Sequence, residues 1–580
     1  MAASLESLFS SSSTEVFPLE LLLSYLSQSQ SSTHTYFASL LNQFRIEQIE
    51  FFLSQLLYLA MRSVDMKPLH NFLLDSCVWS SKLSLKLYWL CIAAEADQLQ
   101  WQKSSVSKLM HECEYTIVNG ARPPVPNDFL PPHLLSVNLP EDTEFQSCHK
   151  EVRAEVFTIS IQVASALCEV SVNLVSHQPE LRDSILRASL TTISKWLTDQ
   201  RNHYSTRASE YTQRLLRGAY LPVEFHDVEG VEQIVSILPN ESFCYYTRER
   251  VPYCLLVETV ELNDPQENPG SSKSEELEAQ EMQDLDLLGL TEKSRPWGER
   301  WAEKKNRLSL ASQYSTLESW RLRGFIVKGL DDLRQEHLAM QFIKVAKLIF
   351  EETRMKLWLR PYDILVISNN SGLIELVPDA LSIDSLKKNC PEYVSLRWFF
   401  ERYLDLPFED AQRNFVESMA GYSLICYLLN LKDRHNGNIM LDRYGHIMHI
   451  DYGYILTNSP GKNLGFETAP FKLNEELIEV MDGKDSYMYN YYKILMFQGL
   501  LALRKHADKL IKPIEVMHPG EHLHCFKDAS RAVSELKARF MLEKTDMQVY
   551  AKLERLVDKA LKSWTTAKYD SYQRYSNGIL

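Results

Sequence analysis

The sequence feature that most constrains this chain is the segment from Asp433 to Asp451, in which polar residues are interrupted by short apolar runs. Asn438 follows Asp433 by five positions, and Asp451 follows it by eighteen, at the head of an Asp-Tyr-Gly triplet. Carboxylate and amide oxygens are the hard ligands that Mg²⁺ prefers in proteins. The spacing therefore predicts a divalent-cation site, and a fold that brings the two segments together.

The same spacing occurs in enzymes that transfer a phosphoryl group from ATP. Protein kinases have His-Arg-Asp-x-x-x-x-Asn, followed later by an Asp-Phe-Gly aspartate that binds the metal. Such transfer needs Mg²⁺ on the β- and γ-phosphates and a group that orients or deprotonates the attacking hydroxyl. Asn438 and Asp451 are thus the predicted Mg²⁺ ligands, with Mn²⁺ as an alternative ion, and ATP is the predicted phosphoryl donor. Here, however, the order is Asp433-Arg434-His435.

This inverted order resembles that of the phosphoinositide kinases. Three stretches carry the resemblance: KDRHNGNIMLD at 432–442, GHIMHIDYG at 445–453 and NLGFETAPFKL at 463–473. They are similar to the type III phosphatidylinositol 4-kinases of the beta class. The resemblance implies transfer of the ATP γ-phosphate to the 4-hydroxyl of phosphatidylinositol. It also implies an α+β fold, in which an all-α helical domain precedes a bilobal, protein-kinase-like catalytic domain.

Two side chains of the predicted catalytic loop can serve the attacking hydroxyl. Asp433 has the spacing of the hydroxyl-orienting aspartate, and His435 has an ordinary pKa near neutrality, which suits proton transfer. The sequence does not decide between them. Arg434 is a further candidate catalytic residue, with positioning of the loop as its alternative role. His449 alternates with Ile450 on a predicted strand, which favours packing beneath Asp451.

A second segment matches the phosphate-binding lysine of kinases. Phe325 to Lys328 is an apolar run that ends in a lysine, the pattern of a strand that presents an ammonium group to ATP. The acidic residues that follow fit the first turn of a helix, where the dipole favours them. Glu336 is predicted to hold Lys328 in place. Residues 328–336 also match the phosphoinositide-kinase pattern K-x-x-D-D-L-R-Q-[DE].

The remaining ATP contacts follow from the resemblance. Glu375 and Val377 correspond to the hinge, whose backbone would bind adenine, and Tyr362 begins the β-like run that precedes it. Ser312 and Tyr314 lie in a segment that we place where kinases have their glycine-rich loop. That segment, Ser-Gln-Tyr-Ser, contains no glycine.

The stretch after the Asp-Tyr-Gly triplet is nearly uncharged, and Lys462 is its only cation before Lys472. A headgroup that already carries ring phosphates would require several Lys or Arg side chains. A single lysine suits the one phosphodiester of phosphatidylinositol. Lys462 is therefore the predicted headgroup contact.

Composition limits the alternatives. Hydrophobic residues make up 45% and charged residues 24% of 580 residues, as in globular proteins, and the net charge of −14 argues against nucleic-acid binding. Ten cysteines are too dilute for a disulfide scaffold. No uninterrupted apolar run reaches about 18 residues. We therefore expect a cytoplasmic protein without a transmembrane segment that associates peripherally with membranes, and the resemblance suggests the Golgi or a related endomembrane.

Periodicity and turn residues suggest the domain boundaries. We expect a disordered N-terminus (1–15), a helical lipid-kinase-unique domain (16–118), a Pro-rich linker (119–150) and a helical segment (151–217). The catalytic domain follows (218–580), with an N-lobe (218–377) and a C-lobe (378–580). Within the N-lobe, residues 263–300 form an acidic insertion, read as a solvated loop or as a docking segment.

The C-terminal region, from Met541 to Leu580, mixes apolar, aromatic and Lys positions, which fits either a membrane-surface helix or a packed C-lobe helix. The expected partners are phosphatidylinositol in membranes and, from the resemblance, a Rab- or Arf-type GTPase at the helical domain or a recruitment adaptor. Two rival functions are a protein Ser/Thr kinase of the lipid-kinase-like group and a catalytically silent scaffold. The intact set of Lys328, Glu336, Asp433, Asn438 and Asp451 argues against the scaffold.

Overall fold

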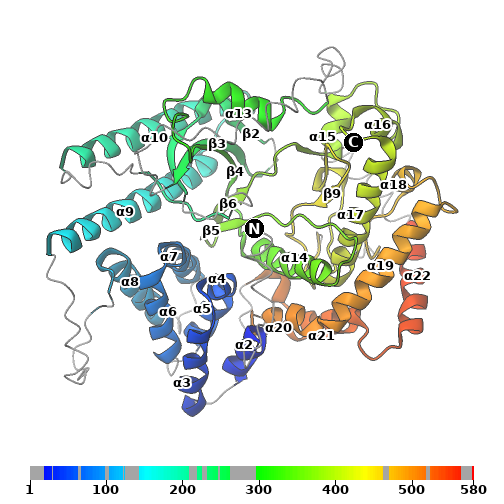
Figure 1. Ribbon diagram of the computed structural model, residues 1–580, viewed down its shortest axis with the longest axis horizontal. Coiled ribbons are helices and arrows are strands. Elements are labelled where there is room, and N and C mark those ends of the chain that lie inside the picture. Colours follow the sequence, from blue (N-terminus) through cyan, green and yellow to red (C-terminus); the bar gives the residue numbers. More distant parts are fainter. Residues whose placement is uncertain are drawn as a thin grey trace.

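The computed structural model describes residues 18–28, 31–62, 67–97, 103–121, 123, 143–207, 218–224, 232–245, 249–261, 296–460, 469–517, 523–562 and 578–579. Within these ranges a block of short helices, a sheet flanked by two long helices, and a mainly helical region lie side by side (Figure 1). The predicted α+β architecture, with helices ahead of two lobes, is confirmed.

The N-terminal helical block explains the leucine periodicity of the sequence. Leu22, Leu23, Leu26 and Leu56 are fully buried in a shared core. The Ser80 hydroxyl accepts a hydrogen bond from the Leu83 N–H and so begins one of the helices. The block consists of α2 (Leu19–Gln28), α3 (Ser31–Leu40), η1 (Leu41–Gln43), α4 (Ile46–Phe51), α5 (Leu53–Arg62), α6 (Lys67–Trp79), α7 (Ser81–Ala96) and α8 (Lys103–Asn119).

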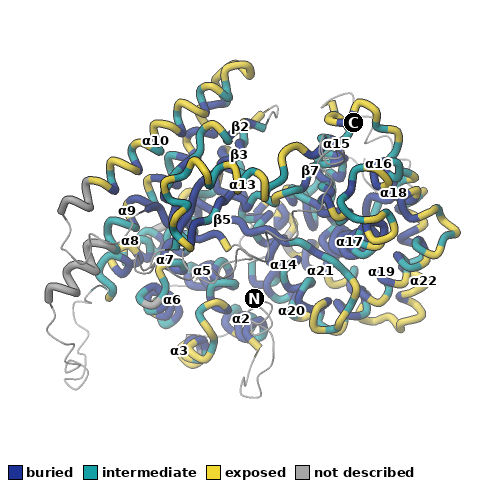
Figure 2. Tube along the Cα trace, turned by 45° about the horizontal axis from the view of Figure 1, so that its top comes forward, coloured by how far each residue is buried: buried dark blue, intermediate teal, exposed yellow. Residues whose placement is uncertain are grey.

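Two long helices, α9 (Thr143–Leu174) and α10 (Pro179–Arg207), form an antiparallel pair beside the sheet. Figure 2 shows that α10 is exposed along much of its outer side. Since α9 begins at Thr143, the predicted linker boundary at residue 150 is wrong. The rest of that predicted linker lies largely outside the described residues.

Helix α9 bears on the prediction that no segment of the chain spans a membrane. Among the described residues, its stretch Arg153–Leu174 is long and apolar enough, by length and composition, to cross a membrane, with 22 residues and a mean hydropathy of 1.4. Half of that window is buried within the protein. Leu167 and Leu174 are fully buried in the same core as the helical block. Packing within the protein thus accounts for this apolar character.

The N-lobe sheet has the strand order β1-β3-β4-β6-β5, and all these pairs are antiparallel. Tyr253 lies opposite Val327, so the turn between β2 and β3 lies at the Lys328 end of β4. β3 is apolar on both faces because both faces are covered. The strands are β1 (Glu232–Ile237), β2 (Phe243–Cys244), β3 (Tyr253–Glu261), β4 (Arg321–Gly329), β5 (Ile364–Ser368) and β6 (Ser371–Glu375), with η4 (Pro239–Glu241) and α13 (Trp301–Ser309) in the connections.

The second lobe surrounds α17 (Phe408–Leu429), which is buried on nearly all sides and carries the chain to the catalytic loop (Figure 2). Asn430 ends it in a left-handed conformation. Helix α14 (Arg334–Glu352) joins the two lobes. The other elements are β7 (Ala380–Ser382), α15 (Ile383–Asn389), α16 (Leu396–Tyr403), η5 (Asn436–Asn438), β8 (Ile439–Asp442), β9 (Ile447–His449), α18 (Glu475–Val480), α19 (Tyr487–Lys505), α20 (Ala507–Met517), η8 (His524–Phe526), α21 (Ala529–Phe540) and α22 (Asp546–Leu561).

Helix α22 matches the predicted C-terminal helix, and its Leu553 and Val557 are buried in the core of this lobe. Residues 563–577, which include Trp564, lie outside the described residues. The membrane-surface interpretation of that segment therefore stays a prediction.

Candidate active site

Lys328, near the end of β4, is held by the helix that follows it. Its Nζ lies 3.5 Å from Glu336 Oε2 and 3.6 Å from Asp331 Oδ2. The Tyr362 hydroxyl donates to the other oxygen of Glu336. Burial alone would lower the pKa of Lys328, but the carboxylates of Glu336, Asp451 and Asp331 outweigh it and raise that pKa above its ordinary value. The lysine is therefore a fixed cation, as the sequence predicts.

Tyr362, which the sequence analysis grouped with the ATP contacts, binds Glu336 instead. It is 3% exposed and its hydroxyl binds Glu336, so it lies behind the carboxylate that orients Lys328. Its pKa is raised well above the ordinary value, first by burial and then by the charge of Glu336. Tyr362 thus supports the site through Glu336.

Arg434 ties the catalytic loop to the Asp-Tyr-Gly segment. Its guanidinium donates to the carbonyl oxygens of Lys432 at 2.9 Å, Ile450 at 2.7 Å and Asp451 at 2.5 Å. These bonds bring the two separated halves of the predicted cation site together. They also give Arg434 the positioning role, which the sequence left as an alternative.

The loop turns back on itself around Asn438. The Asn438 side-chain N–H donates to the Asp433 carbonyl oxygen at 3.0 Å, and the Ile450 N–H donates to the Asn438 carbonyl oxygen at 3.1 Å. Since the Asn438 amide nitrogen holds the loop, its amide oxygen is the atom that can bind a cation.

His435 lies beside Asp433, with His435 Nε2 at 3.9 Å from Asp433 Oδ1. Its Nδ1 accepts a hydrogen bond from the Gly437 N–H at 3.1 Å. Burial lowers the pKa of His435; the charge of Asp433 opposes that effect, and those of Arg434 and Lys472 add to it. The ring is therefore neutral at pH 7.

Asp451 faces the N-lobe lysine from the opposite lobe. Its Oδ1 accepts from the Gly453 N–H at 3.1 Å. Although burial raises its pKa, the charges of Lys328 and Arg434 outweigh burial and lower it. His449, 3% exposed, stacks on Tyr422 with ring centroids 5.5 Å apart, which supports its predicted packing role.

This donor set fits Mg²⁺. Mg²⁺ is commonly bound through one or two protein carboxylates, with substrate phosphates and waters as the other ligands. Asp451 supplies an ionised carboxylate and Asn438 an amide oxygen, opposite the lysine that would bind the same phosphates. Among the described residues, no group of three or more His, Cys, Asp or Glu side chains could hold a metal by itself.

The assignment of Ser312 and Tyr314 to the phosphate loop is wrong. Both precede the first residue of β4, whereas Lys328 is near its last. Lys328 lies seven positions after Arg321 along the strand, a distance of roughly 23 Å. The Tyr314 hydroxyl instead accepts a hydrogen bond from Arg201 of α10. The segment that reaches the Lys328 end of the sheet is the β2–β3 connection, described at 245 and 249–252.

Arg250 in that connection is a candidate that the sequence reasoning missed. Its guanidinium forms an ion pair with Asp331, which also lies beside Lys328. Tyr454 has its pKa raised, first by burial and then by Asp433 and Asp451, while Arg250 opposes the shift. Arg250 thus lies near both the catalytic loop and the lysine. The strand pairing of β3 with β4 was the signal that could have located it.

Two buried polar side chains also escaped the sequence analysis. Gln335 donates from Nε2 to the Tyr452 carbonyl oxygen at 2.9 Å and accepts from the Cys525 N–H at 3.0 Å, so it links α14 to the Asp-Tyr-Gly segment. Lys472, 3% exposed, donates to Asn436 Oδ1 at 3.1 Å. Both lie inside quoted motifs, but their roles depend on contacts that a motif does not specify.

The hinge assignment stays a prediction. The Glu375 N–H donates to the Asp363 carbonyl oxygen at 2.9 Å, so only the Glu375 carbonyl is left to face adenine. The Glu375 carboxylate binds Arg360 at 2.7 Å, and burial raises the pKa of Glu375 despite that arginine. Val377 lies beyond the last β4–β6 pair, Phe325 with Glu375, where its backbone is outside the ladder. Lys462 lies outside the described residues.

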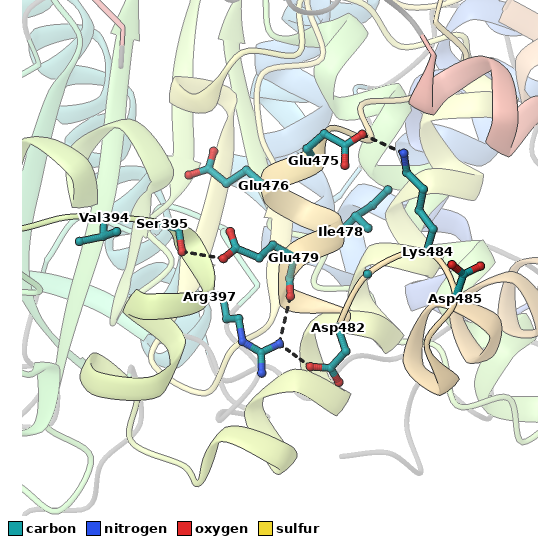
Figure 3. A pocket seen from close by; sticks show the side chains of 11 residues that line it. Val394, Ser395, Arg397, Glu475, Glu476, Ile478, Glu479, Asp482, Lys484 and Asp485 are labelled. Carbon is teal, nitrogen blue, oxygen red and sulfur yellow. Dashed lines mark hydrogen bonds and ion pairs between the residues drawn. The ribbon is translucent and has the colours of Figure 1, made fainter.

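A separate pocket of about 960 Å³ lies between α16 and α18 (Figure 3). Glu475, Glu479 and Asp482 line it, and Arg397 reaches across to Asp482 and to the Glu479 carbonyl oxygen. None of the predicted site residues lines it. It is therefore distinct from the candidate active site.

The region that contains the candidate site is similar in sequence to known proteins. Residues 323–523 match the family described as "Phosphatidylinositol 3- and 4-kinase". The chain is 50% identical over 285 residues to phosphatidylinositol 4-kinase beta of Homo sapiens and of Danio rerio, and 49% identical over 290 residues to phosphatidylinositol 4-kinase beta 1 of Arabidopsis thaliana. Each match covers 49% of this chain and 35%, 34% and 26% of these relatives, so the chain spans about a third or less of their length.

The fold, the site and the match show that residues 323–523 are similar to the phosphatidylinositol 3- and 4-kinase family. Among the members of that family, the phosphatidylinositol 4-kinase beta proteins are similar to this chain, as the sequence resemblance predicted.

Proposed function

We propose that this protein is a phosphatidylinositol 4-kinase, which transfers the γ-phosphate of ATP to the 4-hydroxyl of phosphatidylinositol. The observation that carries the proposal is the juxtaposition of Asp433, Asn438 and Asp451 with the Lys328–Glu336 pair, in a region about 50% identical to relatives of that name. The choice of lipid and of the 4-hydroxyl rests on that similarity. The rival functions lack a specific supporting observation.

The chain's own groups divide the work. Lys328 binds the nucleotide phosphates, and Asn438 and Asp451 hold Mg²⁺, with Mn²⁺ as an alternative. The metal supplies charge neutralisation of the phosphates when it is bound. Glu375 and Val377 would receive adenine through their backbones.

Hydrogen bonding in the catalytic loop favours Asp433 over His435 as the proton acceptor. A neutral imidazole that accepts at Nδ1 carries its hydrogen on Nε2. Because His435 Nδ1 accepts from Gly437, its Nε2, which faces Asp433, is a donor. Asp433 would then receive the proton of the attacking hydroxyl, and His435 would orient that carboxylate or a phosphate oxygen.

The test is transfer of radiolabelled phosphate from ATP to a panel of phosphatidylinositol, phosphatidylinositol 4-phosphate, phosphatidylinositol 4,5-bisphosphate and a protein substrate. We expect label on phosphatidylinositol alone, at the 4-position. Label on the protein substrate alone would instead identify a protein kinase.

The proposal also includes the location of the reaction. The protein would be cytoplasmic and would bind peripherally to a membrane that contains the lipid, at the Golgi or a related endomembrane. A Rab- or Arf-type GTPase at the helical block, or an adaptor, would recruit it. Similarity to the family supports these statements. We also propose the domain division given above, with two changes. The linker ends before α9 begins at Thr143, and the insertion ends before residue 296.

A further inference from the structure

Helix α9 packs against the end of the sheet that carries Lys328. Ser171, on this helix, is 1% exposed. Its hydroxyl donates to the Val251 carbonyl oxygen at 2.8 Å and accepts from the Gly329 N–H at 2.9 Å. Val251 precedes β3 and Gly329 ends β4, so one side chain holds the ends of two neighbouring strands.

Helix α9 packs so closely on these strands that no side chain fits between them at Gly329. A Cβ atom at Gly329 would lie 2.9 Å from Val172 Cγ2 and 3.1 Å from the Cys168 carbonyl oxygen. The Tyr253 hydroxyl, fully buried, donates to the Leu167 carbonyl oxygen at 2.8 Å. Glycine at position 329 therefore allows α9 to sit directly on the backbone of β4.

Each of the two strand ends adjoins a basic residue. Gly329 directly follows Lys328, and Val251 directly follows Arg250. Arg250 pairs with Asp331, which lies 3.6 Å from Lys328. The Ser171 hydroxyl is therefore one residue away from each of the two basic side chains at this end of the sheet.

We propose that Ser171 is a positioning residue for ATP: its two hydrogen bonds hold the Lys328 strand and the Arg250 turn at the separation that the phosphates require. This inference rests on the proposed kinase function. A helix outside the kinase-family match of residues 323–523 thereby becomes part of the phosphate-binding apparatus.

The experiment replaces Ser171→Ala and compares affinity for ATP with affinity for lipid. Removing a buried hydroxyl that serves two partners should weaken ATP binding about five- to tenfold. The KM for ATP and the Kd for a non-hydrolysable ATP analogue should both rise by that factor, while the KM for phosphatidylinositol changes less than twofold. If Ser171→Ala does not fold, Ser171→Cys, a weaker donor and acceptor, should raise the same Kd about two- to threefold.

The same helix offers a matched control. Ser160 is fully buried, donates to the Val156 carbonyl oxygen at 2.6 Å and accepts from the Tyr220 N–H at 2.8 Å. Its partner lies beside Ala219, which bridges to β1, and Ser160 is about 16 Å along the helix from Ser171. Ser160→Ala should lower Tm comparably and leave the Kd of the ATP analogue unchanged.

Two results would overturn the proposal: an unchanged Kd in the Ser171 variant, or an equal rise in both variants. Binding of the ATP analogue is measured without lipid. A wild-type protein that binds the analogue but phosphorylates no phosphatidylinositol would refute the proposed lipid substrate and leave the role of Ser171 open to the same comparison of Kd values.

Discussion

Both aspartates of the candidate site have left-handed backbones, with φ of 63° at Asp433 and 61° at Asp451. This conformation is uncommon outside glycine and costs of order 1 kcal/mol or more at each position. The surroundings must therefore hold it in place. Arg434, which binds the Ile450 and Asp451 carbonyl oxygens, supplies that restraint. At the scale of single residues, the site is a strained pair of turns fixed by one buried arginine.

Asp451→Asn should abolish transfer and leave the fold intact. The substitution keeps the shape of the side chain but removes the negative charge that would bind Mg²⁺ and that faces Lys328. We expect kcat to fall by about three orders of magnitude, within the usual range for such groups. Transfer of labelled phosphate and the Tm of the variant are the measurements. Substantial activity in the folded variant would remove Asp451 from the metal site.

The two catalytic-loop candidates should respond differently to substitution. Asp433→Asn removes the proposed proton acceptor and should lower kcat at least about a hundredfold. His435→Gln keeps an N–H donor in the imidazole's place and should lower kcat only about tenfold. The measurement is kcat of both variants with phosphatidylinositol as substrate. A larger loss in His435→Gln than in Asp433→Asn would identify His435 as the proton acceptor.

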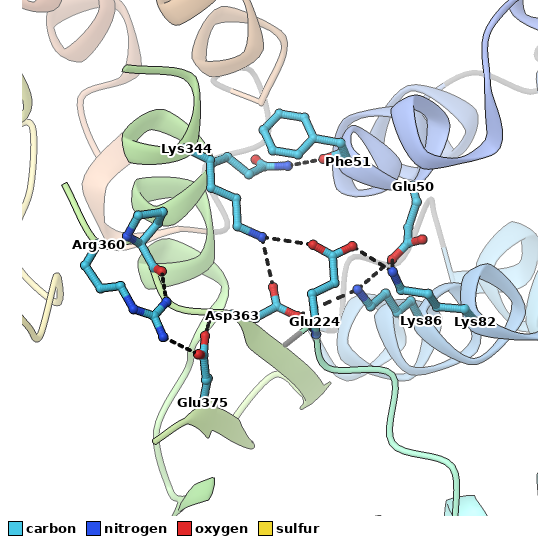
Figure 4. A network of polar contacts seen from close by, with 11 residues as sticks. Glu50, Phe51, Lys82, Lys86, Glu224, Lys344, Arg360, Asp363 and Glu375 are labelled. Carbon is cyan, nitrogen blue, oxygen red and sulfur yellow. Dashed lines mark hydrogen bonds and ion pairs between the residues drawn. The ribbon is translucent and has the colours of Figure 1, made fainter. Parts of the chain in front are cut away.

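At the scale of elements, helix α14 is held from the helical block as well as from the kinase lobes. Arg334 pairs with Asp97, which caps α7, at 2.5 and 3.0 Å. Figure 4 shows Glu50 of α4 paired with Lys82 and Lys86 of α7. In the same network Glu224 pairs with Lys82 and with Lys344 of α14, which also pairs with Asp363. Lys344 lowers the pKa of Glu224, so this carboxylate stays charged. The helix that carries Glu336 is therefore anchored to the helical block as well as to the kinase lobes.

His337 on α14 makes this contact sensitive to acid. Burial lowers its pKa to about 4; Asp363 and Glu224 oppose the shift, and Lys86 and Lys344 add to it. The unfolded chain, with an ordinary pKa near 6.5, binds a proton that the folded chain rejects until about pH 4. The stability contributed by the neutral ring is thus present above pH 6.5 and is lost as pH falls towards 4.

The measurement compares the wild type with His337→Gln, which stays neutral at every pH. Between pH 7 and pH 5 the wild type should lose about 1–2 kcal/mol of unfolding free energy relative to the variant. Denaturant unfolding at several pH values gives this difference. Parallel pH curves for the two proteins would show that His337 titrates alike in the folded and unfolded chain.

The comparison of sequence and structure shows which contacts can be predicted. Asp433, Asn438 and Asp451 could be proposed from the sequence because metal and phosphate chemistry restricts both residue type and spacing. Ser312 and Tyr314 were misplaced because, without glycine, nothing in the sequence marks the loop that covers phosphate. Gln335 and Ser171 were missed because they bind backbone groups, and any polar side chain of suitable length can do so. Such partners become visible only when strands and helices are placed together.

At the scale of the whole molecule, the connection between β3 and β4 crosses from one lobe to the other. Trp297 is 7% exposed, packs on Phe399 and donates to the Tyr403 carbonyl oxygen at 2.8 Å. Arg300 forms two bonds to the Asp405 carboxylate, at 2.6 and 2.7 Å. The predicted solvated insertion at 263–300 therefore extends too far. Its last residues, from 296 onward, are anchored on the C-lobe, whereas residues 262–295 lie outside the described part of the chain.

The other end of this connection returns to the N-lobe. Lys304 and Arg307 of α13 bind Glu241 in η4, each at 2.9 Å. The side-chain hydrogen bonds of these two residues lower the pKa of Glu241 to about 2, although burial opposes them. Residues 296–309 thus join the two lobes on the side where α13 lies, in addition to the chain that runs through the hinge.

Two deletions separate the acidic insertion from this connection. Replacing 263–294 by a short flexible linker should leave Tm and turnover on detergent-dispersed phosphatidylinositol nearly unchanged, because the length of a surface loop affects stability only weakly. Extending the deletion to residue 300 also removes the Trp297 and Arg300 contacts. Loss of a buried tryptophan alone lowers the free energy of unfolding by about 3–5 kcal/mol, so Tm should fall by several degrees.

If the shorter deletion already abolished turnover at an unchanged Tm, the acidic residues would belong to the site. If both deletions behaved like the wild type, the anchoring of 296–300 would be dispensable, and the lobes would be held by the hinge and α14 alone.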